Sequence, residues 1–222
     1  MEQLTQSEEN YIKAIFAIQE RTKKSVGTND LAERMDTKAS SVTDMVKRLS
    51  DKAFIQYEKY KGCRLTEEGS RIALKTIRKH RLWETFLVEK LNFGWEEVHE
   101  VAEQLEHIQS VKLTNQLDRF LEYPKFDPHG DPIPDQNGDY TTHEKSVQLS
   151  ILKKDIEAII VGVSDSSGSF LKYLDKHNIQ IGSTIKVNEH FEFDDSLEVV
   201  LNGKILNLSA VASTKIRTQV QD

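Results

Sequence analysis

Residues 28–65 read TNDLAERMDTKASSVTDMVKRLSDKAFIQYEKYKGCRL, and this stretch decides the fold of the amino-terminal part of the chain. Two short helical segments are separated by the break D-T-K-A, and the second begins with Ser40 and Ser41. Its buried face is predicted by apolar residues at helical spacing, which are Val42, Met45, Val46 and Leu49. The following residues alternate around Gly62 and indicate a two-stranded ribbon. A helix-turn-helix followed by such a ribbon is a winged helix.

The charge of this region indicates a polyanionic partner. Residues 37–81 contain twelve Lys/Arg and five Asp/Glu, a net charge of +7, so the rest of the chain carries −13 of the total of −6. Hydroxyl groups and backbone donors at a helix start bind phosphates, and Lys and Arg supply the counter-charge. The candidate DNA contacts are Lys38, Ser40, Ser41, Thr43, Asp44, Lys47, Arg48, Lys59, Lys61 and Arg64. The alternative is a small protein-interaction module with a solvated basic face.

The segments around the winged helix are predicted to be helical. Residues 5–20 show apolar helical spacing, with Thr5 or Ser7 as the cap. A long helix is predicted from Thr66 to the stop at 92–94, followed by helices over 95–107 and 110–123. These three helices are rich in Leu, Ile and Phe, and we expect them to form a dimerisation bundle, which a palindromic DNA target requires.

The carboxy-terminal third changes to a β pattern. All four prolines lie within the eleven residues 124–134, which excludes regular structure there and marks a domain boundary. Beyond it lie β-rich runs, a short helix at 168–177 and Asn202-Gly203, a strong type I′ hairpin signal. We therefore predict a mainly α protein with a small β domain: a winged helix-turn-helix (1–74), a helical dimerisation and metal-binding domain (75–145) and an SH3-like β-barrel (146–222).

Composition restricts the setting of the protein. No apolar run reaches the roughly 20 residues that a membrane span needs, and the first ten residues are polar and acidic, unlike a secretory signal. Cys63 is the single cysteine, which excludes an intramolecular disulfide and fits a reducing compartment. We therefore expect a cytoplasmic protein with no membrane partner.

A metal site is indicated by carboxylates and imidazoles on two predicted helices. His80 and Glu84 share one helical face at i and i+4. In E-E-V-H-E-V-A-E-Q-L-E-H (96–107), a helix would place four such side chains within an arc of roughly 100°, namely His99, Glu103, Glu106 and His107. Such ligands hold first-row divalent metals. A salt-bridged solvent face is the alternative, and we expect the other histidines at 129, 143, 177 and 190 to be ordinary core or surface residues.

The order of these features resembles the diphtheria-toxin-repressor family of metal-dependent transcriptional regulators. The resemblance rests on the winged helix, R-K-H-R-L-W-E, V-H-E-V-A-E-Q-L-E-H, F-D-P-H-G-D-P-I-P and the small β-barrel, and it covers nearly the whole chain. It implies a repressor without enzymatic activity or small organic substrate. Such a repressor binds a palindromic double-stranded operator as a homodimer, usually before metal-uptake genes, when it is loaded with Mn²⁺ or Fe²⁺. It also implies that the barrel is of FeoA type.

The resemblance implies two metal sites. One matches His80, Glu84 and His99, and the other matches Glu103, Glu106 and His107 with a first-helix ligand at Asn10. The family completes the first site from the barrel, where Asp165 is the candidate. Members typically offer Met or Asp at the position of Asn10, so this chain departs from the pattern there.

The position of Glu103 bears on the choice of metal. Iron-responsive members have a cysteine there and manganese-responsive members a carboxylate. A set of oxygen and imidazole ligands suits Mn²⁺, with Fe²⁺ as the alternative and Zn²⁺ or Co²⁺ expected to bind in vitro.

Two other functions use the same residues. Glu96-x-x-His99 is the E-x-x-H motif of di-iron or di-manganese carboxylate oxidases, but no second such motif lies on a long partner helix. A DNA-binding scaffold with a purely structural metal is the other alternative, and its DNA affinity would not follow the metal concentration. The H-E-x-x-H motif of zinc proteases is absent from the sequence.

Overall fold

The computed structural model describes residues 4–141, 143 and 146–220. The predicted domain boundary between 145 and 146 falls on residue 145, which lies outside the described residues. The chain divides into two compact units. The first contains Met1–His80, Gln104–Val111 and Pro134–Asp139, and the second contains Arg81–Glu103, Lys112–Ile133 and Tyr140–Asp222.

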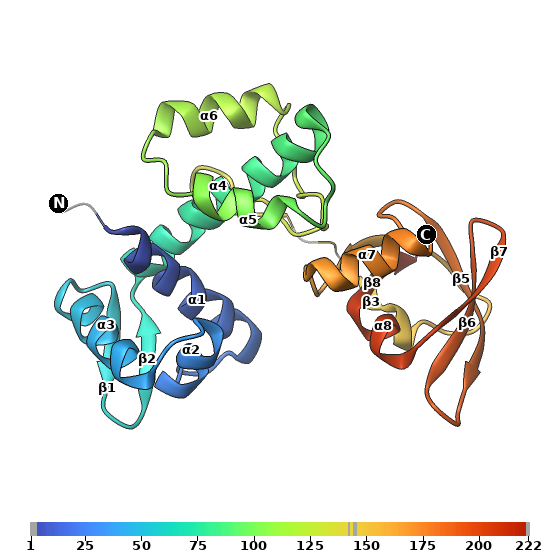
Figure 1. The fold of residues 1–222 in the computed structure, drawn as a ribbon, viewed down its shortest axis with the longest axis horizontal. Coiled ribbons are helices and arrows are strands. Elements are labelled where there is room, and N and C mark those ends of the chain that lie inside the picture. Colours follow the sequence, from blue (N-terminus) through green and yellow to red (C-terminus); the bar gives the residue numbers. More distant parts are fainter. Residues whose placement is uncertain (1–3, 142, 144–145, 221–222) are drawn as a thin grey trace. The chain divides into compact units, whose positions relative to one another are not determined.

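The first unit contains the predicted winged helix (Figure 1). Its elements are α1 (Gln6–Thr22), α2 (Thr28–Arg34), α3 (Ala39–Asp51), β1 (Ile55–Glu58), β2 (Gly62–Leu65) and the first half of α4 (Glu67–Leu91). Thr5 caps α1 in a capping box, because its hydroxyl accepts from the Glu8 N–H while the Glu8 carboxylate accepts from the Thr5 N–H. The two strands pair antiparallel, with Ile55 opposite Leu65.

The core of the winged helix is formed where helical periodicity predicts it. Its fully buried members include Ile12, Ile15, Val26, Leu31, Val42, Val46 and Leu49, whereas Met45 is only partly buried. The ribbon turns at 59–61, and Gly62 begins the second strand with φ +90°. A Cβ at Gly62 would lie 2.4 Å from the Val26 carbonyl oxygen, so this close approach requires glycine.

The helix predicted over 95–107 is shorter than expected. The structure shows α5 over Val98–Leu105, and α6 follows over Val111–Phe120. The Ile108 N–H donates to the Leu105 carbonyl at 3.2 Å, so the chain closes a tighter turn there instead of adding another α-helical turn. Glu106 and His107 therefore lie in a turn beyond the helix, and their predicted place on one helical face with His99 and Glu103 is wrong.

The second unit holds two apolar cores. The smaller joins α4 to α6 and the loop after it through Leu82, Leu117, Leu121 and Ile133. The larger lies in the β domain, between its sheet and the helices α7 (Gly168–Lys176) and α8 (Ala210–Lys215). Among the described residues, no helix is both long and apolar enough to cross a membrane.

The β domain is built on one antiparallel sheet of six strands. They are β3 (Val147–Gln148), β4 (Glu157–Val163), β5 (Thr184–Phe191), β6 (Ser196–Leu201), β7 (Lys204–Leu208) and β8 (Ile216–Val220), in the order β3-β8-β4-β5-β6-β7, and a short 3-10 helix (Leu149–Ile151) follows β3. Asn202 and Gly203 both have positive φ (47° and 82°), which confirms the type I′ turn between β6 and β7. The sequence reading did not foresee β3, β8 or α8.

Candidate metal centre

In the first unit, α1 meets residues 104–111 at a group of carboxylates and imidazoles. The His107 Nδ1 lies 2.6 Å from Glu9 Oε2, and the Gln109 side-chain amide donates to Glu9 Oε1 at 2.6 Å. The His107 Nε2 faces the Glu106 carboxylate at 3.8 Å. A carboxylate that holds one ring nitrogen of a histidine orients the other nitrogen toward a metal. Glu9 therefore has this orienting position, which the sequence reading missed.

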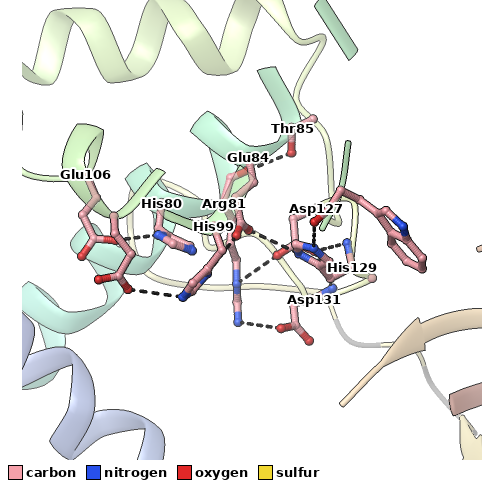
Figure 2. Close-up of polar contacts among 12 residues, drawn as sticks. His80, Arg81, Glu84, Thr85, His99, Glu106, Asp127, His129 and Asp131 are labelled. Atoms are coloured by element: carbon pink, nitrogen blue, oxygen red, sulfur yellow. Dashed lines mark hydrogen bonds and ion pairs between the residues drawn. The ribbon is translucent and has the colours of Figure 1, made fainter. Parts of the chain in front are cut away.

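The Glu106 carboxylate is the most deeply buried acid of this group, with no exposed surface. Both of its oxygens accept hydrogen bonds from the Lys13 ammonium, at 2.7 and 2.8 Å. Its Oε2 also lies 2.7 Å from His80 Nδ1, on α4 (Figure 2). Glu106 thus connects α1, α4 and the turn after α5.

Asn10 carries an unsatisfied acceptor. Its side-chain oxygen is buried and has no hydrogen-bond partner in the described part of the chain. Buried polar atoms in proteins are almost always paired, and an amide oxygen is a ligand for hard divalent cations. The residue at which this chain departs from the family pattern therefore has an oxygen without a hydrogen-bond partner.

In the second unit, α4 and α5 bring together three of the predicted ligands. The His99 Nδ1 lies 3.3 Å from Glu84 Oε1, and its Nε2 lies 3.6 Å from Glu103 Oε1. Glu84 is buried, whereas the His99 side chain is 46% exposed, so the group opens to solvent at its α5 side. His80 precedes Glu84 by four residues on the same helix.

Two further residues join Glu84, and the sequence reading missed both. Asp127 and His129, in the proline-rich loop, each offer a ligand atom, and with one from Glu84 these atoms lie within 4.8 Å of one another (Figure 2). All three side chains are buried. The expectation that His129 is an ordinary core or surface histidine stays a prediction, and its place in this group makes it a candidate ligand instead. The available signal was the sequence Asp127-Pro-His129, in which two potential ligands stand two residues apart in a turn.

The loop is shaped to present these side chains. The Asp127 Oδ1 accepts from the backbone N–H groups of His129 (2.8 Å) and Asp131 (3.0 Å), which closes a side-chain-to-backbone turn. The His129 Nε2 lies 2.8 Å from the Trp95 carbonyl oxygen, so the proton is on Nε2 and the Nδ1 lone pair faces Glu84 at 3.6 Å when the ring is neutral.

The electrostatics of this group favour a bound cation. The pKa of Asp127 is raised to about 7, first by burial and then by the charges of Asp131 and Glu84, against the lowering effect of Arg81 and His129. Burial alone would lower the pKa of His129, but the hydrogen bond and charge of Glu84 outweigh it and raise this pKa to about 9. The group thus retains protons near neutral pH to balance its carboxylates. A divalent cation would supply the same charge.

The β domain touches the same loop. The His129 carbonyl accepts from the Val163 N–H at 3.0 Å, and Arg217 pairs with Asp131 at 2.7 Å. Gly130 has φ +80°, and a Cβ there would lie 2.1 Å from the Val161 carbonyl oxygen. Only glycine allows β4 to pack this closely against the loop.

The other predicted metal-site candidate and the other histidines have ordinary partners. Asp165 accepts from the Lys215 ammonium and from the Ser167 N–H, and although burial opposes it, these bonds lower the pKa of Asp165. Its role as a ligand stays a prediction. The remaining histidines pack on aromatic rings or contact a backbone carbonyl: His143 on Phe126, His177 on Tyr173 and His190 at Leu152.

The predicted DNA-binding residues lie on the surface of the winged helix. All of them are exposed except Thr43, which is half-buried. No side chain caps the start of α3 at Lys38, so its first backbone donors are available to a phosphate. Arg64 donates to the Ser25 hydroxyl at 2.9 Å, which fixes one guanidinium on the ribbon.

Comparison with known proteins bears on both regions. Residues 3–63 match the iron-dependent repressor N-terminal DNA-binding domain, residues 66–135 match the iron-dependent repressor metal-binding and dimerisation domain, and residues 147–219 match the FeoA domain. The HTH-type transcriptional regulator MntR of Bacillus pumilus is 32% identical over 150 residues, which cover 68% of this chain and 92% of that protein.

Two further similarities extend this comparison. The iron-dependent repressor IdeR of Mycobacterium tuberculosis is 32% identical over 134 residues, which cover 60% of this chain and 58% of that protein. The chain therefore matches little more than half the length of this relative. A solved structure described as a manganese-dependent transcriptional repressor in complex with manganese has a TM-score of 0.86 and 32% identity, over 96% of this chain and all of that one.

This similarity includes the winged helix, the region with the grouped carboxylates and imidazoles, and the β domain. The chain belongs to the iron-dependent repressor family of metal-dependent, DNA-binding transcriptional regulators, in which diphtheria toxin repressor is also found.

Proposed function

We propose that this protein is a Mn²⁺-responsive repressor that binds a palindromic operator as a homodimer in the cytoplasm and controls metal-uptake genes. The observation that carries this proposal is the meeting of α1, part of the DNA-binding domain, with residues 104–111 through Glu9, Glu106 and His107. The chain is proposed to comprise three domains over 1–74, 75–145 and 146–222, and the family matches at 3–63, 66–135 and 147–219 support this division.

Two sets of residues are proposed as metal ligands. Asn10, Glu106 and His107 would hold one ion, and the family resemblance adds Glu103. The buried Asn10 oxygen without a partner supports this set. Glu84, Asp127 and His129 would hold a second ion, with His99, His80 and Asp165 as the further ligands that the resemblance implies. A bound divalent ion would supply the positive charge that holds carboxylates of separate segments together.

The donor atoms support manganese. They are carboxylate and amide oxygens and imidazole nitrogens, which suit a hard cation. The one thiol of the chain, Cys63, is buried in the winged-helix core, and burial raises its pKa to about 12. Fe²⁺ is the alternative physiological metal, and Zn²⁺ and Co²⁺ are expected to bind in vitro.

The coupling to DNA follows from where the ligands stand. Asn10 lies on α1, and His107 lies in the turn that precedes α6 along the chain. Ligands on both segments would make metal binding and the ordering of α1 one event, so metal would favour the DNA-competent conformation. A coupling of about 1–3 kcal/mol is the usual scale for such a switch.

The dimer surface is proposed to lie on α6. This helix buries Leu117, yet it leaves Leu113 40% and Phe120 60% exposed, and the two are seven residues apart, on one helical face. Exposed apolar groups of this size on one short helix mark an interaction surface, and the matched domain is a dimerisation domain. A two-fold dimer would present two winged helices to the two half-sites of a palindrome.

The alternative functions fare differently. Members of this family are DNA-binding repressors without enzymatic activity, so the carboxylate oxidase is not retained. The DNA-binding scaffold with a purely structural metal remains distinguishable by experiment, because its DNA affinity would be the same with and without Mn²⁺.

For the metal set around Glu84, we predict that His129→Ala lowers the number of Mn²⁺ ions bound per chain by one. The substitution removes a buried nitrogen ligand from a group that has two carboxylates. Equilibrium dialysis with metal analysis measures the stoichiometry, and His177→Ala in the β domain is the control that should bind as wild type does. Equal stoichiometry in His129→Ala and wild type would contradict the assignment.

For DNA binding, the target is a duplex selected from a random pool by its binding to the wild-type protein. We predict that Mn²⁺ raises the affinity of the wild-type protein for this duplex by about tenfold or more. Fluorescence anisotropy with Mn²⁺ or with EDTA measures this. The double variant Lys47→Ala/Arg48→Ala should lose affinity because counter-charge on α3 is removed, and it should show a weaker salt dependence. Lys153→Ala/Lys154→Ala, exposed on the β domain, is the matched control. An affinity independent of Mn²⁺ would favour the scaffold.

For assembly, we predict that Phe120→Glu converts the homodimer to a monomer, because it places a charge in the apolar interface. Sedimentation velocity measures the mass in solution. Phe193→Glu is the matched control, since Phe193 is fully exposed in the turn between β5 and β6 and belongs to no proposed interface. A Phe120→Glu protein that stays dimeric would exclude α6 as the dimer surface.

A further inference from the structure

The Lys13 ammonium pairs with Glu106, which is a proposed metal ligand. The ammonium bonds both oxygens of Glu106, at 2.7 and 2.8 Å, across 93 residues of sequence. The Lys13 side chain is 19% exposed and the Glu106 side chain is fully buried. This is therefore an ion pair in a largely desolvated setting, where the Coulomb attraction is stronger than at the surface and where leaving one partner unpaired is costly.

The geometry makes Lys13 and a metal ion compete. Carboxylate oxygens bind divalent cations at roughly 2.0–2.2 Å, and each Glu106 oxygen already accepts a short bond from the same ammonium. The Oε2 atom accepts a further bond from His80 Nδ1 when that nitrogen is protonated. Both oxygens of Glu106 thus already have a donor, and an approaching cation would meet a like charge within hydrogen-bond distance of its ligand.

The charged side chains around Glu106 lead to the same conclusion. The buried acids there are Glu9 and Glu106, and the amines are Lys13 and Lys79, which is buried and feels the charge of both acids. With neutral imidazoles the two acids and two amines balance. A divalent ion added without any rearrangement would leave an excess of two positive charges in a buried site, or of one if Glu103 also binds the ion, and either excess is strongly unfavourable. One amine must therefore withdraw, and Lys13, which is partly exposed at the rim, can reach water.

We propose that Lys13 is an affinity-determining residue of the metal centre: a tethered counter-ion on α1 that must leave Glu106 before a metal can bind there, and that thereby sets the metal concentration at which the protein responds. This inference rests on the proposed function as a metal sensor. It adds to that function a residue which no ligand set contains and which acts against metal binding.

The test compares Mn²⁺ binding to Lys13→Gln and to the wild-type full-length protein. Gln keeps a hydrogen-bond donor for Glu106, so the fold is retained, but it removes the competing charge. We expect Lys13→Gln to bind Mn²⁺ about tenfold more tightly than wild type at the site that contains Glu106. Electron paramagnetic resonance measures the free Mn²⁺ in each titration, from which the affinity follows. Lys13→Arg, which keeps the charge, should bind no more tightly than wild type.

A second readout separates this role from a merely structural one. In thermal unfolding, Lys13→Gln should lower the melting temperature in EDTA and show a larger rise on addition of Mn²⁺ than wild type does. The matched control is Lys52→Gln, which removes a similar partly buried ion pair to α1, between Lys52 and Glu8 at 2.9 Å. It should lower the melting temperature without changing the Mn²⁺ affinity.

The Mn²⁺-binding results separate a failure of the Lys13 proposal from a failure of the proposed function. Unchanged or weaker Mn²⁺ binding in Lys13→Gln, with wild type binding normally, overturns the role of Lys13 and leaves the proposed function intact. Binding by neither protein overturns both. Binding by Lys13→Gln alone would support Lys13 as the competitor and show that the wild-type response lies at higher metal concentration.

Discussion

The buried carboxylate of Glu106 is the constraint on which the first unit depends. A fully desolvated anion must be matched by positive charge or by hydrogen-bond donors. In this protein, the match comes from Lys13 on α1 and from His80 on α4. The helix that begins the DNA-binding domain is therefore held to residues 104–111 by electrostatics, assisted by the contact of Glu9 with His107 and Gln109. A charge-based connection of this kind is open to control by a cation in a way that an apolar contact is not.

The second group of ligands has a different setting. Glu84 lies on a helix, whereas Asp127 and His129 lie in a loop that β4 covers at close range. Arg81 and Arg217 pair with different oxygens of Asp131, at 3.6 and 2.7 Å, so the loop is anchored to α4 and to the β domain together. Asp127, with a pKa of about 7, and His129, with a pKa of about 9, retain protons near neutral pH. A metal ion that binds this buried group would therefore displace protons.

The sequence predicted the parts of the structure that local rules govern. The winged helix followed from helical periodicity, the ribbon from alternation, and the hairpin from Asn202-Gly203, because each signal lies within about a dozen residues. The prediction that Glu106 and His107 share a helical face with His99 and Glu103 failed because α5 ends at Leu105. There the Ile108 N–H donates to the Leu105 carbonyl, three residues earlier, instead of continuing the α-helical pattern. Glu9, Lys13 and His129 were missed because their importance arises from contacts with segments dozens of residues away, which no periodicity reports.

We propose that metal binding at residues 104–111 acts on the DNA-binding domain through α1. The most direct measurement is the gain in DNA affinity that Mn²⁺ produces, determined by anisotropy for wild type and for His107→Ala. We expect His107→Ala to bind DNA in EDTA as wild type does but to lose most of the Mn²⁺-dependent gain. An equal gain in both proteins would contradict this proposal.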